Sequence, residues 1–222
     1  MRERLKALAR GAATVVVAPA LLSYRIRAAI LGRDRALEGS TQALSLAPGL
    51  LGQYLRRAFL GRVLAECHRS SVVEFGTIFS SADARLEENA YIGPGCHLGL
   101  VHIGPNVLLA AGVKIPSGGK SHGTLDPTVP IRDQPGSPVL VRIGAGSWIG
   151  SGAVVMADVG CDTIVGAGAV VTKALPDRVM AAGVPARVVQ RRDATATRAR
   201  IGGASLLGLS GISDRAADRR RP

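Results

Sequence analysis

The side chains best suited to moving protons near neutral pH are the four histidines of this chain: His68, His97, His102 and His122. His122 alone lies in the stretch 117–138, which is rich in glycine, proline and aspartate and is predicted to be a loop. A neutral imidazole there can take the proton of a hydroxyl group as that hydroxyl attacks a carbonyl carbon. Asp126 could orient the second ring nitrogen of such a base, although an Asp-Pro pair also starts turns. A lone loop histidine is more often structural, so position alone makes His122 only a candidate.

A second arrangement of histidines could hold a metal ion. His97 and His102 are five residues apart and His68 lies upstream, a set that could ligate zinc. A spacing of five does not by itself point both rings at one ion. We therefore expect no metal site.

Charge is distributed unevenly along the 222 residues, whose net charge is +12. Residues 1–70 carry 12 Lys and Arg against 4 acids, residues 71–190 carry 8 against 9, and residues 191–222 carry 8 against 3. A nucleic-acid-binding domain would carry its basic stripe on the folded part, so we expect no nucleic-acid partner. Basic flanks around a neutral domain favour an anionic membrane surface, with solvated basic tails as the alternative.

The chain has three cysteines and no CxxC pair, which favours a reducing compartment.

A six-residue period reveals the elements that must position these side chains. Apolar residues recur every sixth position in short blocks: Val73 and Phe79; Leu86, Ile92 and Leu98; Ile103, Leu109 and Ile115; Ile143, Ile149 and Val155; Val165 and Val171. A period of six fits neither a helix nor a flat strand, but it fits a chain that runs two residues straight, turns a corner and repeats. Three such sides close a coil of about 18 residues, and stacked coils form a parallel β-helix. The repeat blocks predict about four and a half coils spaced ~4.8 Å apart.

Four stretches make the pattern specific: Ile143–Gly150 (IGAGSWIG), Val165–Lys173 (VGAGAVVTK), Ala182–Arg187 (AGVPAR) and Ser121–Pro127 (SHGTLDP). With them the chain resembles the hexapeptide-repeat acyltransferases, left-handed β-helix enzymes that include galactoside, maltose and xenobiotic acetyltransferases. It is most like the branch found with capsule, colanic-acid and other exopolysaccharide genes. The resemblance implies an all-β fold, a left-handed parallel β-helix, acetyl-CoA as cosubstrate, a homotrimer, and a sugar or glycan acceptor.

The resemblance also implies roles for individual residues. The family's catalytic histidine lies in a loop about two dozen residues before a tryptophan, and His122 precedes Trp148 by 26. The positions that match coenzyme A contacts are Trp148, Ser151, Ala167, Thr172, Lys173 and Arg187. Lys173 and Arg187 would meet phosphates. Trp148 could instead pack against a neighbouring chain.

Residues 1–70 are predicted to form a basic, helical extension ahead of the repeat domain at 71–190, and 191–222 to form a disordered basic tail. The run Gly11–Tyr24 is apolar but shorter than the ~20 residues that span a bilayer, which favours an interfacial anchor. Its Ala18-Pro19-Ala20 also suits a signal-peptide cleavage site.

The range Leu50–Cys67 predicts an amphipathic helix, with its arginines off an apolar face made by Leu51, Tyr54, Leu55, Ala58, Phe59, Val63 and Cys67. That face could cap the β-helix or lie in a membrane interface.

Together these patterns predict an O-acyltransferase that uses acetyl-CoA and modifies a sugar hydroxyl in polysaccharide or lipid-linked glycan assembly. We expect it in the cytoplasm, at the inner face of the cytoplasmic membrane, because an acyl-CoA donor is cytosolic. The alternatives are a metal-binding protein like the gamma-class carbonic anhydrases and a non-catalytic β-helix scaffold.

Overall fold

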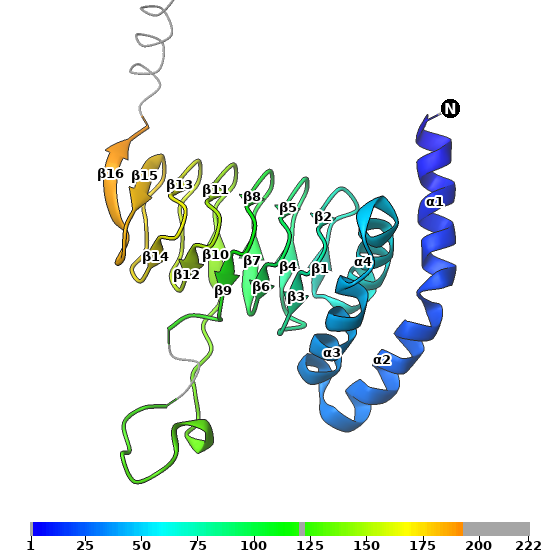
Figure 1. The fold of residues 1–222 in the computed structure, drawn as a ribbon, viewed down its shortest axis with the longest axis horizontal. Coiled ribbons are helices and arrows are strands. Elements are labelled where there is room, and N and C mark those ends of the chain that lie inside the picture. Colours follow the sequence, from blue (N-terminus) through cyan, green and yellow to red (C-terminus); the bar gives the residue numbers. More distant parts are fainter. Residues whose placement is uncertain (1, 120–122, 193–222) are drawn as a thin grey trace, which may run out of the picture.

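The computed structural model describes residues 2–119 and 123–192, and in it a prism of short strands is capped at one end by helices (Figure 1). The prism has three sheets, here named A, B and C. Sheet A holds β1 (Glu66–Cys67), β4 (Arg85–Leu86), β7 (Val101–Ile103) and β10 (Val141–Ile143). Sheet B holds β2 (Val72–Val73), β5 (Tyr91–Ile92), β8 (Leu108–Leu109), β11 (Trp148–Ile149), β13 (Ile164–Val165), β15 (Val179–Ala182) and β16 (Arg187–Arg191). Sheet C holds β3 (Ile78–Phe79), β6 (His97–Leu98), β9 (Lys114–Ile115), β12 (Val154–Val155) and β14 (Val170–Val171).

The predicted period is confirmed as the repeat of a parallel β-helix. Each apolar position of the period stacks on the one a coil below, as Ile92, Leu109 and Ile149 do in sheet B, and these side chains are fully buried. Only β16 runs antiparallel, along β15, where it ends the described part of sheet B. Stacked aliphatic residues therefore fill the prism, and burial of their apolar surface is its main source of stability.

The prism is longer than the repeat blocks predict, because sheet B contains six parallel strands and hence about six coils. The first coil begins at Glu66, ahead of the first recognisable repeat. The irregular step between Val155 and Val165 is also part of a regular coil. Val159 bridges Ile143 below it and Leu175 above it, so this coil has only a shorter corner.

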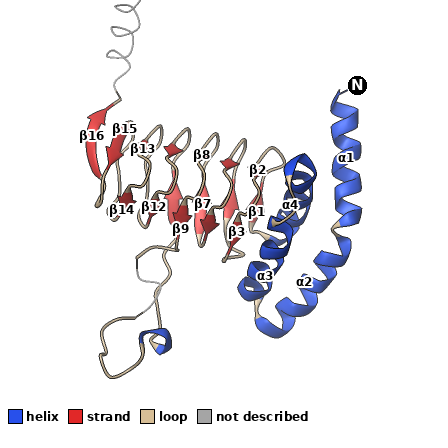
Figure 2. Ribbon diagram, viewed as in Figure 1, coloured by secondary structure: helices blue, strands red, loops and turns tan. Residues whose placement is uncertain are grey.

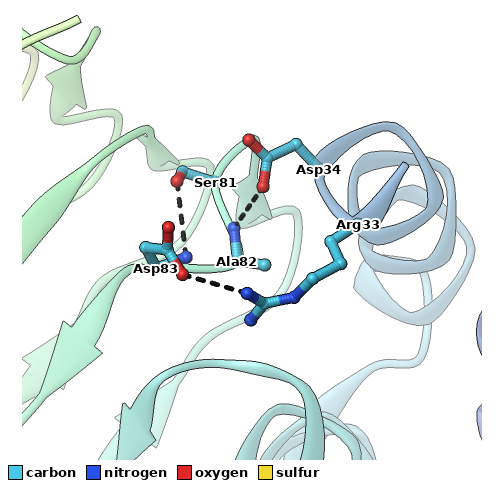
Figure 3. A network of polar contacts seen from close by, with 5 residues as sticks. All are labelled: Arg33, Asp34, Ser81, Ala82 and Asp83. Atoms are coloured by element: carbon cyan, nitrogen blue, oxygen red, sulfur yellow. Dashed lines mark hydrogen bonds and ion pairs between the residues drawn. The ribbon is translucent and has the colours of Figure 1, made fainter. Parts of the chain in front are cut away.

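Four helices precede the prism: α1 (Arg2–Val16), α2 (Ala18–Leu31), α3 (Arg33–Ser45) and α4 (Gly49–Val63) (Figure 2). Helices α3 and α4 contact the first strands, while α1 and α2 pack outside them. Tyr24 of α2 meets the buried Phe59 of α4 edge to face, with ring centroids 5.8 Å apart. Polar contacts fix the start of α3 to the first coil (Figure 3): Asp34 accepts a hydrogen bond from the Ala82 amide at 2.8 Å, and Arg33 pairs with Asp83 at 3.2 Å. The helical extension thus shields the open end of the β-helix.

The predicted helix at 50–67 is confirmed up to Val63, and Phe59 and Val63 of its predicted apolar face are buried, but its predicted end and part of that face were wrong. Cys67 belongs to β1, and Leu51 is exposed. Arg56, expected off the apolar face, is only 2% exposed. Its guanidinium donates to the carbonyl oxygens of Val73 (2.9 Å), Leu44 (3.2 Å) and Ala47 (2.7 Å). A buried charge is tolerated when hydrogen bonds replace its water, and here those bonds fix α4 to α3 and to the first coil.

No single helix in the described residues is both long enough and apolar enough to cross a membrane. The segments Leu8–Val16 and Ala18–Leu31, bent by 47° at their junction, meet the length and composition criteria only as a pair.

Candidate active site

A long loop leaves the prism between β9 in sheet C and β10 in sheet A, as the sequence predicts (Figure 1). Its described part contains a single 3-10 turn at Ile131–Asp133. The side chain of Gln134, 9% exposed, holds this part of the loop together. Its amide nitrogen donates to the carbonyl oxygens of Asp126 (2.6 Å) and Val129 (2.8 Å), and its oxygen accepts from the Asp126 amide (3.2 Å). Hydrogen bonds to one buried side chain therefore take the place of the backbone-to-backbone hydrogen bonds that a helix or sheet would provide in this loop.

Gly123 lies close to the returning part of the loop. A Cβ at this position would lie 2.8 Å from the Pro135 carbonyl oxygen and 3.0 Å from Gln134 Cβ. The backbone beside the predicted catalytic position therefore approaches the returning chain closely, which only glycine permits. His122 itself lies outside the described residues, so its role as general base stays a prediction.

The carboxylate of Asp126 stabilises a turn within the loop. It accepts hydrogen bonds from the Thr128 hydroxyl (2.6 Å) and the Thr128 amide (2.9 Å). These bonds hold the pKa of Asp126 below its usual value, with the hydroxyl contributing most. The described contacts of Asp126 correspond to the turn that an Asp-Pro pair favours. Orientation of His122 by this residue stays a prediction.

Two of the predicted donor positions stack on the corner between sheets B and C. Ser151 follows β11, Ala167 follows β13 one coil above, and the Gly168 amide donates to the Ser151 carbonyl oxygen at 2.8 Å. Gly152 and Gly168 both adopt a left-handed backbone, with φ of 68° and 66°, and added Cβ atoms there would meet nothing within 4 Å. At two successive coils this corner thus has a glycine in open space, which leaves room for a narrow ligand arm.

Thr172, Lys173 and Arg187 lie further along the same end of the prism. Thr172 and Lys173 directly follow β14 in sheet C, and both are exposed. Arg187 begins β16, and the Ala186 amide before it donates to the Val170 carbonyl oxygen of β14 at 2.8 Å. The structure therefore brings Arg187, at the end of sheet B, next to β14 of sheet C, the strand that Thr172 and Lys173 follow.

Trp148 belongs to an apolar row on the outer face of sheet B. Its backbone is in register with Leu108 on one side and Ile164 on the other, and Tyr91 follows below Leu108. The Trp148 side chain is 49% exposed. Both predicted roles, a wall of the donor site and a contact with a neighbouring chain, are compatible with this position.

The other three histidines project from different parts of one chain. His97 is on sheet C, His102 on sheet A contacts the carboxylate of Glu87, and His68 Nδ1 is 2.8 Å from the Ser70 hydroxyl. His97 and His102 therefore do not face a common point within one chain. The residues described, 2–119 and 123–192, include no group of three His, Cys, Asp or Glu side chains that could hold a metal ion.

A cavity of about 390 Å³ lies on the outer face of sheet A around His102, Glu87, Arg142 and Asp158. Arg142 and Asp158 form an ion pair across it at 3.8 Å. None of the predicted donor positions lines it. The donor corner of a single chain is convex surface, so a second surface is needed to enclose a ligand there.

Sequence reasoning missed Gln134 and the row around Trp148. Nothing local distinguishes Gln134 from other polar loop residues, because its importance depends on where the loop folds back. The row around Trp148 could have been predicted from the sequence. Its members each directly precede an apolar residue of the six-residue period: Tyr91, Leu108 and Trp148. Outward residues of equivalent strands stack in neighbouring coils.

No protein-family model matches this sequence, and no curated protein matches it. Solved structures do share its fold. A maltose O-acetyltransferase from Clostridium difficile 630 superimposes with a TM-score of 0.62 at 22% identity, covering 72% of this chain and 88% of that one. Galactoside acetyltransferase in complex with coenzyme A gives 0.58 at 23% identity, covering 80% and 84%. A hexapeptide-repeat acetyltransferase from Vibrio cholerae gives 0.59 at 18% identity, covering 72% and 93%. By structure, the chain is thus similar to hexapeptide-repeat β-helix acetyltransferases.

Proposed function

We propose that this protein is an O-acyltransferase that moves an acetyl group from acetyl-CoA to a sugar hydroxyl in polysaccharide or lipid-linked glycan assembly. The observation that carries the proposal is a long loop, containing His122, inserted into a parallel β-helix of the kind that solved sugar acetyltransferases possess. Fold alone does not determine activity. The match of this loop and of the stretches around Trp148 and Ala167 to family motifs adds support.

His122 acts as the general base. It takes the proton of the acceptor hydroxyl as the oxygen attacks the thioester carbonyl, so that a carbon–oxygen bond forms and the carbon–sulfur bond breaks. The imidazolium then gives its proton to the departing thiolate. Lys173 and Arg187 bind phosphates of the donor, and the bare corner at Gly152 and Gly168 accommodates its narrow pantetheine arm.

The active form is a homotrimer whose sites lie between neighbouring prisms. Two features support this assembly: the donor corner is open on a single chain, and the row Tyr91–Leu108–Trp148 leaves apolar side chains exposed on sheet B. Leu108→Arg should separate the subunits, because a buried unpaired charge is strongly unfavourable at an interface. A wild-type protein that is active while its measured mass is that of a monomer contradicts the trimer.

The enzyme acts at the cytoplasmic face of a membrane. On the outer side of α1 and α2, opposite the buried Ala13, Val17 and Tyr24, apolar side chains recur at helical spacing: Leu8, Val15, Leu22, Ile26 and Ile30, each more than half exposed. Residues 4–32 contain no Asp or Glu. An apolar stripe with only basic charges around it suits an anionic bilayer interface.

A charged substitution in this stripe tests the location better than a truncation would, because deleting the helices uncovers the first coil. Leu22→Asp combined with Ile26→Asp should abolish co-sedimentation with anionic vesicles, whereas Gln42→Asp on α3 should leave it nearly unchanged. Equal sedimentation of all three proteins contradicts the proposed location.

The activity is tested by following thiol release from acetyl-CoA in the presence of a panel of nucleotide-linked and lipid-linked sugars. Transfer is expected to at least one acceptor, with the acetyl group recovered as an ester. A protein that binds no coenzyme A and acetylates none of the panel refutes the proposal and favours a non-catalytic scaffold.

A further inference from the structure

A cationic cavity of about 280 Å³ lies where α1, α4 and the first coil of the prism meet. Three arginines line it: Arg10 from α1, Arg57 from α4, and Arg69 from the corner after β1. Polar side chains that can donate hydrogen bonds complete the wall: Gln53, Tyr54, Ser70 and Ser71. This cavity lies at the end of the prism opposite to the predicted donor positions, so it is separate from the proposed acyl-transfer site.

No carboxylate is among the residues that line this cavity. The nearby Glu74 carboxylate is bonded by Gln53 Nε2 at 2.8 Å and lies within 3.4 Å of the Tyr91 hydroxyl. Burial lowers the pKa of Arg57, and the positive charge of Arg10 lowers it further. The cavity therefore gathers cations whose desolvation and mutual repulsion are offset by no lining carboxylate and only in part by Tyr54.

Two of the arginines have donors available for a ligand. Arg10 Nε is buried and has no hydrogen-bond partner among the described residues. Arg57 is held with its guanidinium carbon 5.0 Å from the centroid of the Tyr54 ring, and one of its terminal nitrogens donates to the Arg69 carbonyl oxygen at 2.8 Å. Stacking and this bond fix the plane of the guanidinium and leave its other donors for a second acceptor. A buried donor without a partner is destabilising, so Arg10 Nε leaves part of the hydrogen-bonding capacity of this guanidinium unused.

The cavity also has an apolar rim. Leu50, which is 72% exposed, lines it directly, and the neighbouring Leu51 is equally open to solvent. Cationic donors below exposed leucines suit a ligand that carries a phosphate at one end and hydrocarbon at the other.

We propose that the Arg10–Arg57–Arg69 pocket binds the phosphate group of an anionic phospholipid. Guanidinium groups match phosphate oxygens in pairs, and a cluster of them in a partly desolvated cavity binds the group more tightly than scattered surface charges do. The pocket thereby gives the helical extension a specific headgroup contact in addition to its apolar stripe. This inference does not depend on the acyl-transfer activity.

The test measures binding of the full-length protein to phosphatidylglycerol-containing vesicles and to neutral phosphatidylcholine vesicles. Arg57→Gln should weaken binding to the anionic vesicles by ~10- to 100-fold, the range for loss of charge-assisted hydrogen bonds. Arg57→Lys, which keeps the charge and loses the planar fork, should show an intermediate loss. Arg35→Gln is the matched control, since it removes a positive charge from an exposed site of the same segment, and it should change binding less than ~5-fold. Circular dichroism and the urea midpoint verify that each variant is folded.

Two outcomes overturn the proposal. Equal losses for Arg35→Gln and for the pocket variants would mean that the vesicles sense only total charge. Inorganic phosphate that binds the pocket as tightly as the vesicles do, with the same sensitivity to the pocket variants, would identify a site for free phosphate instead of a lipid. Retained selectivity for anionic vesicles in millimolar phosphate supports the lipid assignment.

Discussion

Replacing Gln134 by alanine should loosen the loop between β9 and β10 while leaving the prism intact. The substitution removes three hydrogen bonds, two donated to the carbonyl oxygens of Asp126 and Val129 and one accepted from the Asp126 amide. At about 0.5–1.5 kcal/mol for each of the three bonds, the loop loses roughly 1.5–4.5 kcal/mol of its stability. Because 1.4 kcal/mol corresponds to a factor of ten, the population of open loop conformations should rise by ~10-fold or more. None of the lost bonds involves the β-helix, so the free energy of global unfolding should change little.

Hydrogen exchange and turnover together test this reasoning. The Asp126 amide should exchange at least ~10-fold faster in Gln134→Ala, and kcat should fall by a similar factor, because His122 is carried by the same loop. The urea midpoint should stay within error of wild type. Gln42→Ala, the same chemical change at an exposed site on α3, should alter none of these quantities. Unchanged exchange at Asp126 would show that Gln134 does not hold the loop, and faster exchange with full turnover would show that loop order is irrelevant to catalysis.

Two other predictions concern stability and thiol chemistry. Arg56→Ala should lower the free energy of unfolding, measured by urea denaturation, by about 2–4 kcal/mol, because three backbone carbonyls lose their donor. The control Arg35→Ala should change the free energy of unfolding by no more than about 0.5 kcal/mol. Equal effects of the two substitutions would contradict the bonding described for Arg56. Burial raises the pKa values of Cys67 and Cys96 to about 11, so both remain protonated thiols at pH 8 and should resist iodoacetamide until the pH approaches 11 or the protein unfolds. The exposed Cys161 should therefore be alkylated first at pH 8, and rapid labelling of all three in the native protein would refute this order.

The sequence predicted the prism well because the core residues of a β-helix recur at a short, regular spacing along the chain. Ile92, Leu109 and Ile149 are recognisable as interior positions without knowledge of any distant contact. The number of coils was underestimated, because the first coil packs under helices and the corner before Val159 is shortened. The early start of the first coil and the shortened corner both depend on contacts with a neighbouring coil or helix. A local sequence period contains no information about such contacts.

In the helical extension, by contrast, the local sequence pattern predicted the buried residues less well. An arginine in an amphipathic pattern is normally assigned to the solvent side, and Arg56 is buried only because carbonyls of α3, the α3–α4 connection and β2 converge on it. Those acceptors come from three separate segments, so no pattern within α4 could reveal them. The same holds in the candidate site, where Gln134 gains its role from the return of a loop across eight residues to Asp126. The stacking of Ser151 under Ala167, by contrast, follows from the repeat, since they are equivalent positions in successive coils.

The central claim is that His122 is the base in acetyl transfer, and the most direct test is the turnover of His122→Ala with acetyl-CoA and an acceptor identified in the panel. Loss of a general base should lower kcat by at least ~10²-fold, while the Kd for coenzyme A, whose phosphates are bound by Lys173 and Arg187 in the proposed mechanism, should remain within about threefold of wild type. Lys173→Ala should show the reverse pattern, with weaker coenzyme A binding and a smaller effect on kcat. A His122→Ala enzyme that turns over at close to the wild-type rate would contradict the account.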